Sequence, residues 1–173
     1  EPEPIYPVIA PDIPQTENVR GIAPFGAAAV GWLDAPGDRS NWGAGVRVAI
    51  LDTGVDFSHP ALEGVQGTSV NLVEDETDET SYDGHGTAVT GAVLNSNPDA
   101  VIFFVEGFSD AAVLAAANQP LVDIITTSFG PILSVPVPGI EDATKVAVIQ
   151  KMKLHTGAAD NSPSPAVQDS TSG

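Results

Sequence analysis

The sequence contains no cysteine, a single methionine and very few basic residues. Without cysteine there is no disulfide scaffold, no thiol catalysis and no cysteine-ligated zinc site. Only 6 of the 173 residues are Lys or Arg, against 23 Asp or Glu, so the formal net charge is 6 − 23 = −17. Nucleic acids and anionic membrane surfaces are bound through patches of Lys and Arg, so we expect neither as a partner.

Long hydrophobic runs are missing as well. No stretch of eighteen apolar residues is present, so we expect no membrane span. No charged start followed by an apolar stretch marks a signal peptide. The first residue is Glu1 rather than Met, so we expect that the chain was trimmed or cut from a longer one. Its length suits one domain, or a large piece of a bigger one, and 42% apolar residues suffice for a core.

Proline and basic residues are unevenly distributed along the chain. Five prolines lie within residues 1–14, so we interpret residues 1–20 as an extended proline-rich arm. Residues 21–173 are assigned to a single domain. Between Val48 and Thr144 there is no Lys or Arg, whereas fifteen Asp and Glu residues fall in the same window.

Short apolar runs alternate with helical patterns from residue 46 onwards. The predicted strands are residues 46–52, 68–73, 100–106, 122–128 and 153–159, and the predicted helices are residues 85–94, 109–118 and 140–151. This alternation predicts an α/β fold: a doubly wound, mostly parallel sheet with helices on both faces. In such sheets the ligand site lies at the carboxyl ends of the strands.

Three polar residues occupy the positions where such a site is expected. Asp52 ends the first strand, His85 opens a helix between two glycines, and Asn161 follows the last strand. A helix N-terminus disfavours a charged imidazolium, so His85 needs a carboxylate nearby, and Asp52 can supply it. An Asn side chain can donate a hydrogen bond to developing negative charge.

Each of these three signals also has a structural alternative. Asp52 alone can cap a turn, a lone histidine is more often structural, and Asn is common in turns. Asp52–Gly54 (Asp-Thr-Gly) is also the signature of aspartic proteases, but that mechanism needs two such carboxylates and no second copy exists.

Four segments together resemble the subtilisin-like serine proteases, or subtilases. The first runs from Trp42 to Leu62, around Asp52, and the second, DGHGTAVTG, surrounds His85. The other two are DIITTSFG at residues 123–130 and AADN at residues 158–161. The resemblance covers roughly residues 40–165 in the order of the family, and four short motifs in order are far more specific than one.

This resemblance implies a complete chemical assignment. Asp52 would orient His85, His85 would take a proton from a serine hydroxyl, and Asn161 would stabilise the oxyanion. The strand at Ser128, Phe129 and Gly130 would bind the backbone of a peptide or protein substrate. The chemistry needs no cofactor. The resemblance also implies a secreted or cell-surface location and a propeptide or inhibitor as a further partner.

The nucleophile is missing from the chain. In the family it lies in a Gly-Thr-Ser-x-Ala-x-Pro segment well after the oxyanion asparagine, but only twelve residues follow Asn161. Gly67–Val70 (GTSV) precedes His85 and lacks the Ala and Pro. We therefore expect an incomplete catalytic domain that is inactive alone, with the serine supplied by a second polypeptide. The alternative is an inactive subtilase-like fragment or homologue that binds peptides or a partner.

A third interpretation, a nucleotide-binding doubly wound domain, is poor. The first predicted strand is followed by neither a G-x-G-x-x-G loop nor a Walker A loop.

A run of acidic residues precedes His85. Residues 74–79 hold five carboxylates, and alternating oxygen ligands suit calcium. The candidate ligands for a structural calcium ion are Asn71, Glu76, Asp78 and Thr80. A solvated acidic loop is the commoner meaning of such a run, and both interpretations stand here.

Some features of the family are lacking. The short stretch at residues 94–100 does not provide the calcium loop often found there, and Asp160 stands where the family usually has Gly. The remaining histidines, His59 and His155, are expected to be structural, because no zinc-binding spacing joins any two histidines.

Overall fold

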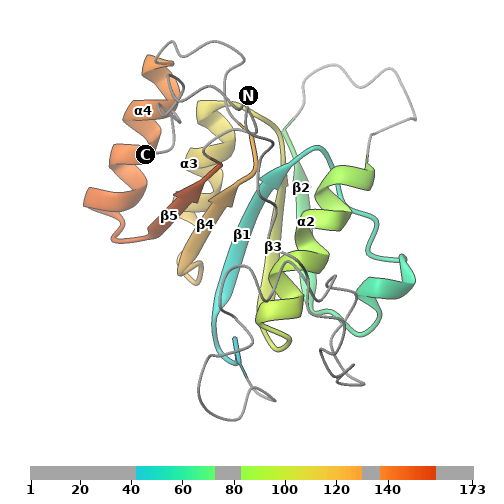
Figure 1. Ribbon diagram of the computed structural model, residues 1–173. Coiled ribbons are helices and arrows are strands. Elements are labelled where there is room, and N and C mark those ends of the chain that lie inside the picture. The colour runs from blue at the N-terminus through green and yellow to red at the C-terminus, as the bar shows by residue number, and fades with distance from the viewer. Residues whose placement is uncertain (1–41, 73–82, 130–136, 159–173) are drawn as a thin grey trace, which may run out of the picture.

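The computed structural model describes residues 42–72, 83–129 and 137–158. Five strands form one sheet in the order β2-β3-β1-β4-β5, and every neighbouring pair is parallel. Helices lie on both faces of this sheet (Figure 1). The fold class predicted from the sequence is confirmed.

The central strand, β1, spans Arg47–Asp52 and lies between β3 (Val101–Glu106) and β4 (Ile124–Thr127). Its residues from 48 to 52 are all buried, because neighbouring strands and helices cover both of its faces. The edges are β2, Gly67–Asn71, and β5, Leu154–Gly157. Apart from β2, whose first residue lies one position earlier than predicted, the strands begin one or two residues after their predicted starts.

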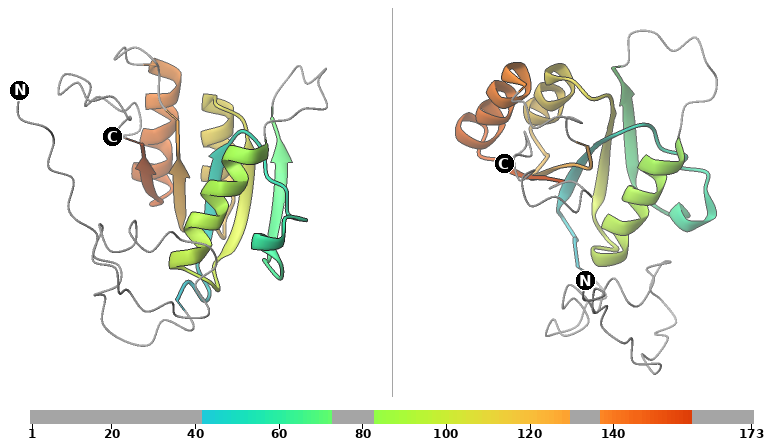
Figure 2. Two further views of the ribbon diagram at one scale, coloured as in Figure 1. Left: turned by 45° about the vertical axis from the view of Figure 1, so that its right-hand side comes forward. Right: turned by 45° about the horizontal axis from the view of Figure 1, so that its top comes forward.

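Helix α2 (Asp83–Ser96) and the short 3-10 helix η2 (Pro60–Leu62) cover one face of the sheet. Helices α3 (Asp110–Asn118) and α4 (Pro138–Lys145) lie side by side on the other face (Figure 2). Each face therefore has its own apolar core. The core under α2 contains Val48, Ile50, Leu62, Leu94, Ala100, Ile102 and Phe104, and the core under α3 and α4 contains Ala49, Leu51, Phe103, Val105, Val113 and Ile125.

Helix α3 begins where its sequence predicts. The Ser109 hydroxyl oxygen accepts a hydrogen bond from the Ala112 N–H at 3.4 Å and caps the helix, and Asp110 lies in the first turn, where negative charge is favourable. Its alanines are small enough to pack closely against the sheet, and Ala112, Ala116 and Ala117 are buried.

The single helix predicted over residues 140–151 is wrong in two respects. Helix α4 begins at Pro138, because proline suits the first helical position, where no N–H is needed. It ends at Lys145, and a π-helical turn, η3 (Val146–Gln150), continues it. Met152 then takes a positive φ of 56°, and the Lys153 N–H donates to the Ala147 carbonyl as the chain turns into β5.

Helix α2 also differs from its prediction. It begins at Asp83 rather than at His85, so the histidine lies in the first turn and not at the first helical position. The proline-rich arm at residues 1–20 lies outside the described residues.

Candidate active site

Asp52 is the last residue of β1 and lies at the carboxyl edge of the sheet, in its middle. Its side chain is 1% exposed. The Thr53 N–H donates to Asp52 Oδ1 at 2.8 Å, and the Thr53 hydroxyl donates to the same oxygen at 3.2 Å. Asp52 Oδ2 is buried and has no hydrogen-bond partner among the described residues. The strand end therefore holds the carboxylate in one orientation, with Oδ1 directed towards α2.

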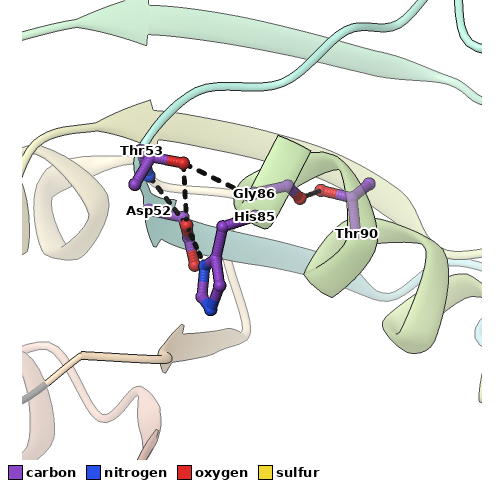
Figure 3. Close-up of polar contacts among 5 residues, drawn as sticks. All are labelled: Asp52, Thr53, His85, Gly86 and Thr90. Atoms are coloured by element: carbon purple, nitrogen blue, oxygen red, sulfur yellow. Dashed lines mark hydrogen bonds and ion pairs between the residues drawn. The ribbon is translucent and has the colours of Figure 1, made fainter. Parts of the chain in front are cut away.

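His85 approaches this carboxylate from the first turn of α2. Its Nδ1 lies 2.6 Å from Asp52 Oδ1, a short hydrogen bond in which an Nδ1–H donates to the carboxylate (Figure 3). The His85 side chain is 51% exposed, whereas Asp52 is almost completely covered. With Nδ1 protonated, Nε2 of the neutral ring carries a free lone pair that can accept a proton.

A close approach of α2 to the loop after β1 makes this contact geometrically possible. A Cβ on Gly86 would lie 2.1 Å from the Gly54 carbonyl oxygen and 2.7 Å from Phe104 Cζ, so only glycine fits. The Gly86 N–H donates to Thr53 Oγ1 at 3.3 Å, and the Thr90 hydroxyl donates to the Gly86 carbonyl at 2.7 Å (Figure 3). Thr53 therefore holds both the aspartate and the start of the helix that carries the histidine.

A second threonine fixes the loop after β1. Thr87 Oγ1 accepts a hydrogen bond from the Asp56 N–H at 2.9 Å. Asp56 in turn accepts from the N–H and the hydroxyl of Ser58, at 2.8 and 2.5 Å, and these two hydrogen bonds lower the pKa of the Asp56 carboxyl. Thr53 and Thr87 both belong to the sequence motifs around the aspartate and the histidine, but the sequence alone assigned neither a role.

Glu106 is a further residue that the sequence interpretation did not assign to the site. It ends β3 in register with Asp52, and it is half-buried. Side chains of register partners on parallel strands project from the same face, so a second acidic side chain lies beside the Asp52–His85 pair. An acidic residue at the carboxyl end of the predicted strand 100–106 was the signal that could have identified it.

The predicted substrate strand is described only in part. Ser128 and Phe129 follow β4 and are half-buried, and Gly130 lies outside the described residues. The Phe129 ring meets the Phe108 ring edge to face, with centroids 4.8 Å apart and planes at 88°. Phe108 is 47% exposed, and its neighbour Gly107 donates its N–H to the Asp52 carbonyl at 3.1 Å. A partly exposed aromatic pair therefore lies at the same edge of the sheet as the Asp52–His85 pair.

Several predicted residues lie outside the described part of the chain. These are Asn161 and three of the four candidate calcium ligands: Glu76, Asp78 and Thr80. Asn71, the fourth, is an exposed residue at the end of β2. Within residues 42–72, 83–129 and 137–158, no group of three or more His, Asp or Glu side chains is arranged to hold a metal ion.

The two other histidines occupy structural positions. His59 caps η2, and its Nδ1 accepts the Ala61 N–H at 3.2 Å. His155 is a half-buried residue of β5 whose ring nitrogens have no hydrogen-bond partner among the described residues, and burial lowers its pKa.

No serine of the described residues hydrogen-bonds to the His85 ring. Ser69, within the GTSV segment, is exposed on the edge strand β2, and β3 separates that strand from β1. The described residues thus contain a hydrogen-bonded Asp52–His85 pair, and no serine hydroxyl among them is bonded to the histidine ring.

The sequence profile described as the Subtilase family matches residues 43–169. The intracellular serine protease of Paenibacillus polymyxa is 27% identical over an alignment of 177 residues, which covers 90% of this chain and 52% of the relative. The major intracellular serine protease of Bacillus subtilis (strain 168) is 31% identical over 129 residues, covering 61% of this chain and 40% of the relative.

The fold is similar to that of solved protease structures. A psychrophilic protease superposes with a TM-score of 0.54 and 26% identity, covering 70% of this chain and 48% of that protease. A mutant of the protease domain of PatA gives a TM-score of 0.52 and 23% identity, covering 70% of this chain and 52% of that domain. The chain spans about half the length of the proteins it matches. Because the family profile matches most of the chain, the protein belongs to the subtilase family of serine proteases.

Proposed function

We propose that this chain supplies the general base of a subtilisin-type serine endopeptidase, with the nucleophilic serine on a second polypeptide. The observation that carries the proposal is the 2.6 Å contact between His85 Nδ1 and the buried Asp52 carboxylate at the carboxyl edge of the sheet. A histidine oriented in this way by a carboxylate is the base of Asp-His-Ser catalysis.

In the proposed mechanism, His85 transfers a proton from the serine to the leaving group. His85 Nε2 takes the proton of the serine hydroxyl as the oxygen attacks the scissile carbonyl, and the resulting imidazolium is stabilised by Asp52. The same proton then passes to the leaving amine. In the second half of the reaction, His85 takes a proton from a water molecule as the water oxygen attacks the acyl group, and the proton returns to the serine as the acyl group is released. Asn161 would donate a hydrogen bond to the tetrahedral oxyanion, an interaction of about 3–4 kcal/mol in such sites.

Substrate binding is assigned to the segment after β4. Ser128, Phe129 and Gly130 would pair with the extended backbone of a peptide by strand addition. Phe108, which is 47% exposed and packs against Phe129, adds apolar surface beside this segment. Glu106 is in register with Asp52, and the sequence before His85 is acidic, so we expect a preference for basic peptides. A surface adapted to salt or calcium is the alternative explanation for the acidic sequence.

A structural calcium ion, a further partner and an extracellular location are also proposed. The acidic run with Asn71 would bind a structural calcium ion, and a propeptide or inhibitor would be a further partner. A secreted or cell-surface location stays a prediction, although two relatives are named intracellular serine proteases. No helix within the described residues is long and apolar enough to cross a membrane.

The second candidate function is that of an inactive subtilase-like module that binds peptides or a partner. The observation that favours it is that no serine of the described residues hydrogen-bonds to the base. The two candidates differ in one outcome. An active two-chain enzyme reacts with a serine-directed covalent inhibitor, and a binding module does not.

The test is to co-purify this chain with the polypeptide that carries the Gly-Thr-Ser-x-Ala-x-Pro segment, and to measure peptide hydrolysis and inhibitor labelling. We expect activity in the complex only, and its loss in His85→Ala. His59→Ala is the matched control, because His59 caps η2 and lies outside the Asp52–His85 pair. Full activity of His85→Ala would show that the assignment of the base is wrong.

A further inference from the structure

The three most exposed large apolar side chains of the described residues lie on neighbouring turns. Leu121 is 63% exposed, Ile149 is 70% exposed and Met152 is 82% exposed. Leu121 belongs to the turn that enters β4, whereas Ile149 and Met152 belong to η3 and the turn that enters β5. Because β4 and β5 are adjacent and parallel, both turns lie at the amino edge of the sheet, where its strands begin. We call these three side chains the amino-edge patch.

Lys153 joins the two turns that carry the amino-edge patch. Its ammonium group donates to the carbonyls of Gln119 and Val122, which flank Leu121. Its backbone N–H donates to the Ala147 carbonyl in η3 at 3.0 Å. The backbones of the two turns are therefore fixed relative to each other, and a segment that binds the patch has little backbone to order there.

The basic residues of the described chain gather at the same edge. Arg47 is the first residue of β1, and Lys151 and Lys153 precede β5. Helix α4 connects the carboxyl end of β4 to the amino end of β5, so Lys145 in its last turn also lies towards the amino edge (Figure 1). In a chain with a net charge of −17, this edge attracts a further acidic segment more than the rest of the described chain does.

Lys151 is the basic residue of this edge that is open to a new contact. Lys145 pairs with Asp142 at 3.1 Å, and Lys153 is engaged by backbone carbonyls. Lys151 is exposed, lies between Ile149 and Met152 in the sequence, and has no ion-pair partner among the described residues. The amino-edge patch is therefore an apolar surface with an available positive charge in it.

The proline-rich segment at residues 1–14 has the complementary composition. It contains no Lys or Arg. Its large apolar residues are Ile5, Tyr6, Val8, Ile9 and Ile13, and its acidic residues are Glu1, Glu3 and Asp12. Five prolines restrict its backbone, so less conformational entropy is lost when the segment is ordered on a surface.

The chain enters the described part of the structure at the amino edge as well. The Trp42 carbonyl accepts a hydrogen bond from the Asp99 N–H at 3.1 Å, just before β3 begins at Val101. From Pro14 to Trp42 there are 42 − 14 = 28 residues, which span up to about 90 Å when extended. Residues 1–14 can therefore reach the patch along this edge without crossing a face of the sheet.

We propose that residues 1–14 dock on the amino-edge patch, with their apolar side chains against Leu121, Ile149 and Met152 and their carboxylates near Lys151. The size of the patch favours a segment of the same chain as the occupant. A stable interface between separate proteins buries about 1,200–2,000 Å² in total, far more than three side chains provide. A tethered segment has an effective concentration of about millimolar, so weak contacts suffice. This docking goes beyond the proposed protease function and does not depend on it.

The absence of cysteine allows a direct test in the full chain. Ala10→Cys is combined either with Gln150→Cys, beside the patch, or with Ala92→Cys, an exposed position on α2. Under mild oxidation in dilute solution, we expect the intramolecular disulfide to form about tenfold faster or more with Gln150→Cys, as measured by intact mass. An undocked arm would favour Ala92→Cys, because Asn97, just after α2, packs against Gly43 close to where the arm joins.

In the Ala10→Cys and Gln150→Cys chain, Met152→Asp tests the apolar contact. We expect it to slow disulfide formation towards the rate of the Ala92→Cys pair, and Asp tolerates the positive φ of this position. Val137→Asp is the matched control, because Val137 is 36% exposed at the other end of α4, where Asp is a favourable N-cap. It should leave the rate unchanged, and circular dichroism verifies that both variants fold.

Charge reversal tests the contact with Lys151. Lys151→Glu should slow disulfide formation by about two- to fivefold, as expected for an exposed ion pair. Glu1→Lys combined with Glu3→Lys should restore the rate in that variant, which a purely structural effect of Lys151→Glu would not allow.

Three results would overturn the proposal. The first is equal or faster disulfide formation with Ala92→Cys than with Gln150→Cys. The second is a rate that Met152→Asp does not change. The third is a disulfide-linked dimer as the main product, which would show that a second copy of the chain covers the patch.

Discussion

The carbonyl oxygen of Gly54 lies 2.1 Å from the point where a Cβ on Gly86 would stand. The loop after the aspartate and the first turn of the histidine helix are therefore in contact at backbone level. Any side chain at position 86 would push α2 away from β1 and lengthen the 2.6 Å contact between Asp52 and His85.

Gly86→Ala should lower the free energy of unfolding of the chain by about 1–3 kcal/mol, because the methyl group overpacks a contact with backbone atoms. Thermal unfolding of the variant measures this. Gly91→Ala, in the same helix, is the matched control: the added methyl group would meet no atom within 4 Å, and helix propensity should raise stability by about 0.5–1 kcal/mol. If Gly86→Ala and Gly91→Ala changed the free energy of unfolding equally, overpacking at Gly86 would not be the cause.

Asp52→Asn in the assembled protease should lower kcat by about 10⁴-fold with little change in KM, because the amide no longer holds His85 with its Nδ1 protonated. Steady-state peptide hydrolysis measures both constants. Asp56→Asn serves as the control, since Asp56 lies only four positions further on but accepts hydrogen bonds from Ser58 rather than from His85. If both variants lost kcat to a similar extent, Asp52 would have no special role in catalysis.

Acid should destabilise the chain through His155. Burial lowers its pKa, so between the unfolded value of about 6.5 and the lowered folded value the unfolded state binds more protons than the folded state. The free energy of unfolding therefore falls as the pH falls through this window, and the penalty is complete below the folded pKa. Comparing denaturant unfolding of the wild type and His155→Gln between pH 7.5 and about 5 isolates this contribution. A wild-type curve that runs parallel to that of the variant would mean that His155 makes no contribution.

Calcium should raise the melting temperature if the acidic run before His85 binds the ion, because a ligand that binds only the folded state stabilises it. Asp78→Ala should abolish that rise, and Asp99→Ala, an acidic residue outside the run, should preserve it. A melting temperature that does not respond to a chelator would leave the solvated loop as the correct interpretation.

The strands and the Asp52–His85 pair were predictable because each is indicated by a pattern of neighbouring residues in the sequence. The apolar run that ends at Asp52 specifies a buried strand with a polar carboxyl end, and the glycines around His85 indicate a close backbone approach. The parallel order of the sheet then brings the two residues to one edge.

The remaining features depend on contacts between segments far apart in the sequence. The break between α4 and η3 shows in no periodicity, because residues 140–151 keep a helical pattern through it. The position of Glu106 beside Asp52 depends on the register of β1 against β3, which a single sequence does not specify. The roles of Thr53 and Thr90 depend equally on how α2 approaches the loop after β1.

The central position of β1 has a consequence for how the chain folds during synthesis. β1 emerges first of the five strands, yet its two neighbours, β3 and β4, begin only at Val101 and Ile124. It therefore has no strand to pair with until β3 has emerged, and long-range parallel pairing is intrinsically slow. During that interval an apolar segment is exposed, and the acidic sequence between β1 and β3, through self-repulsion, would oppose aggregation of the nascent chain.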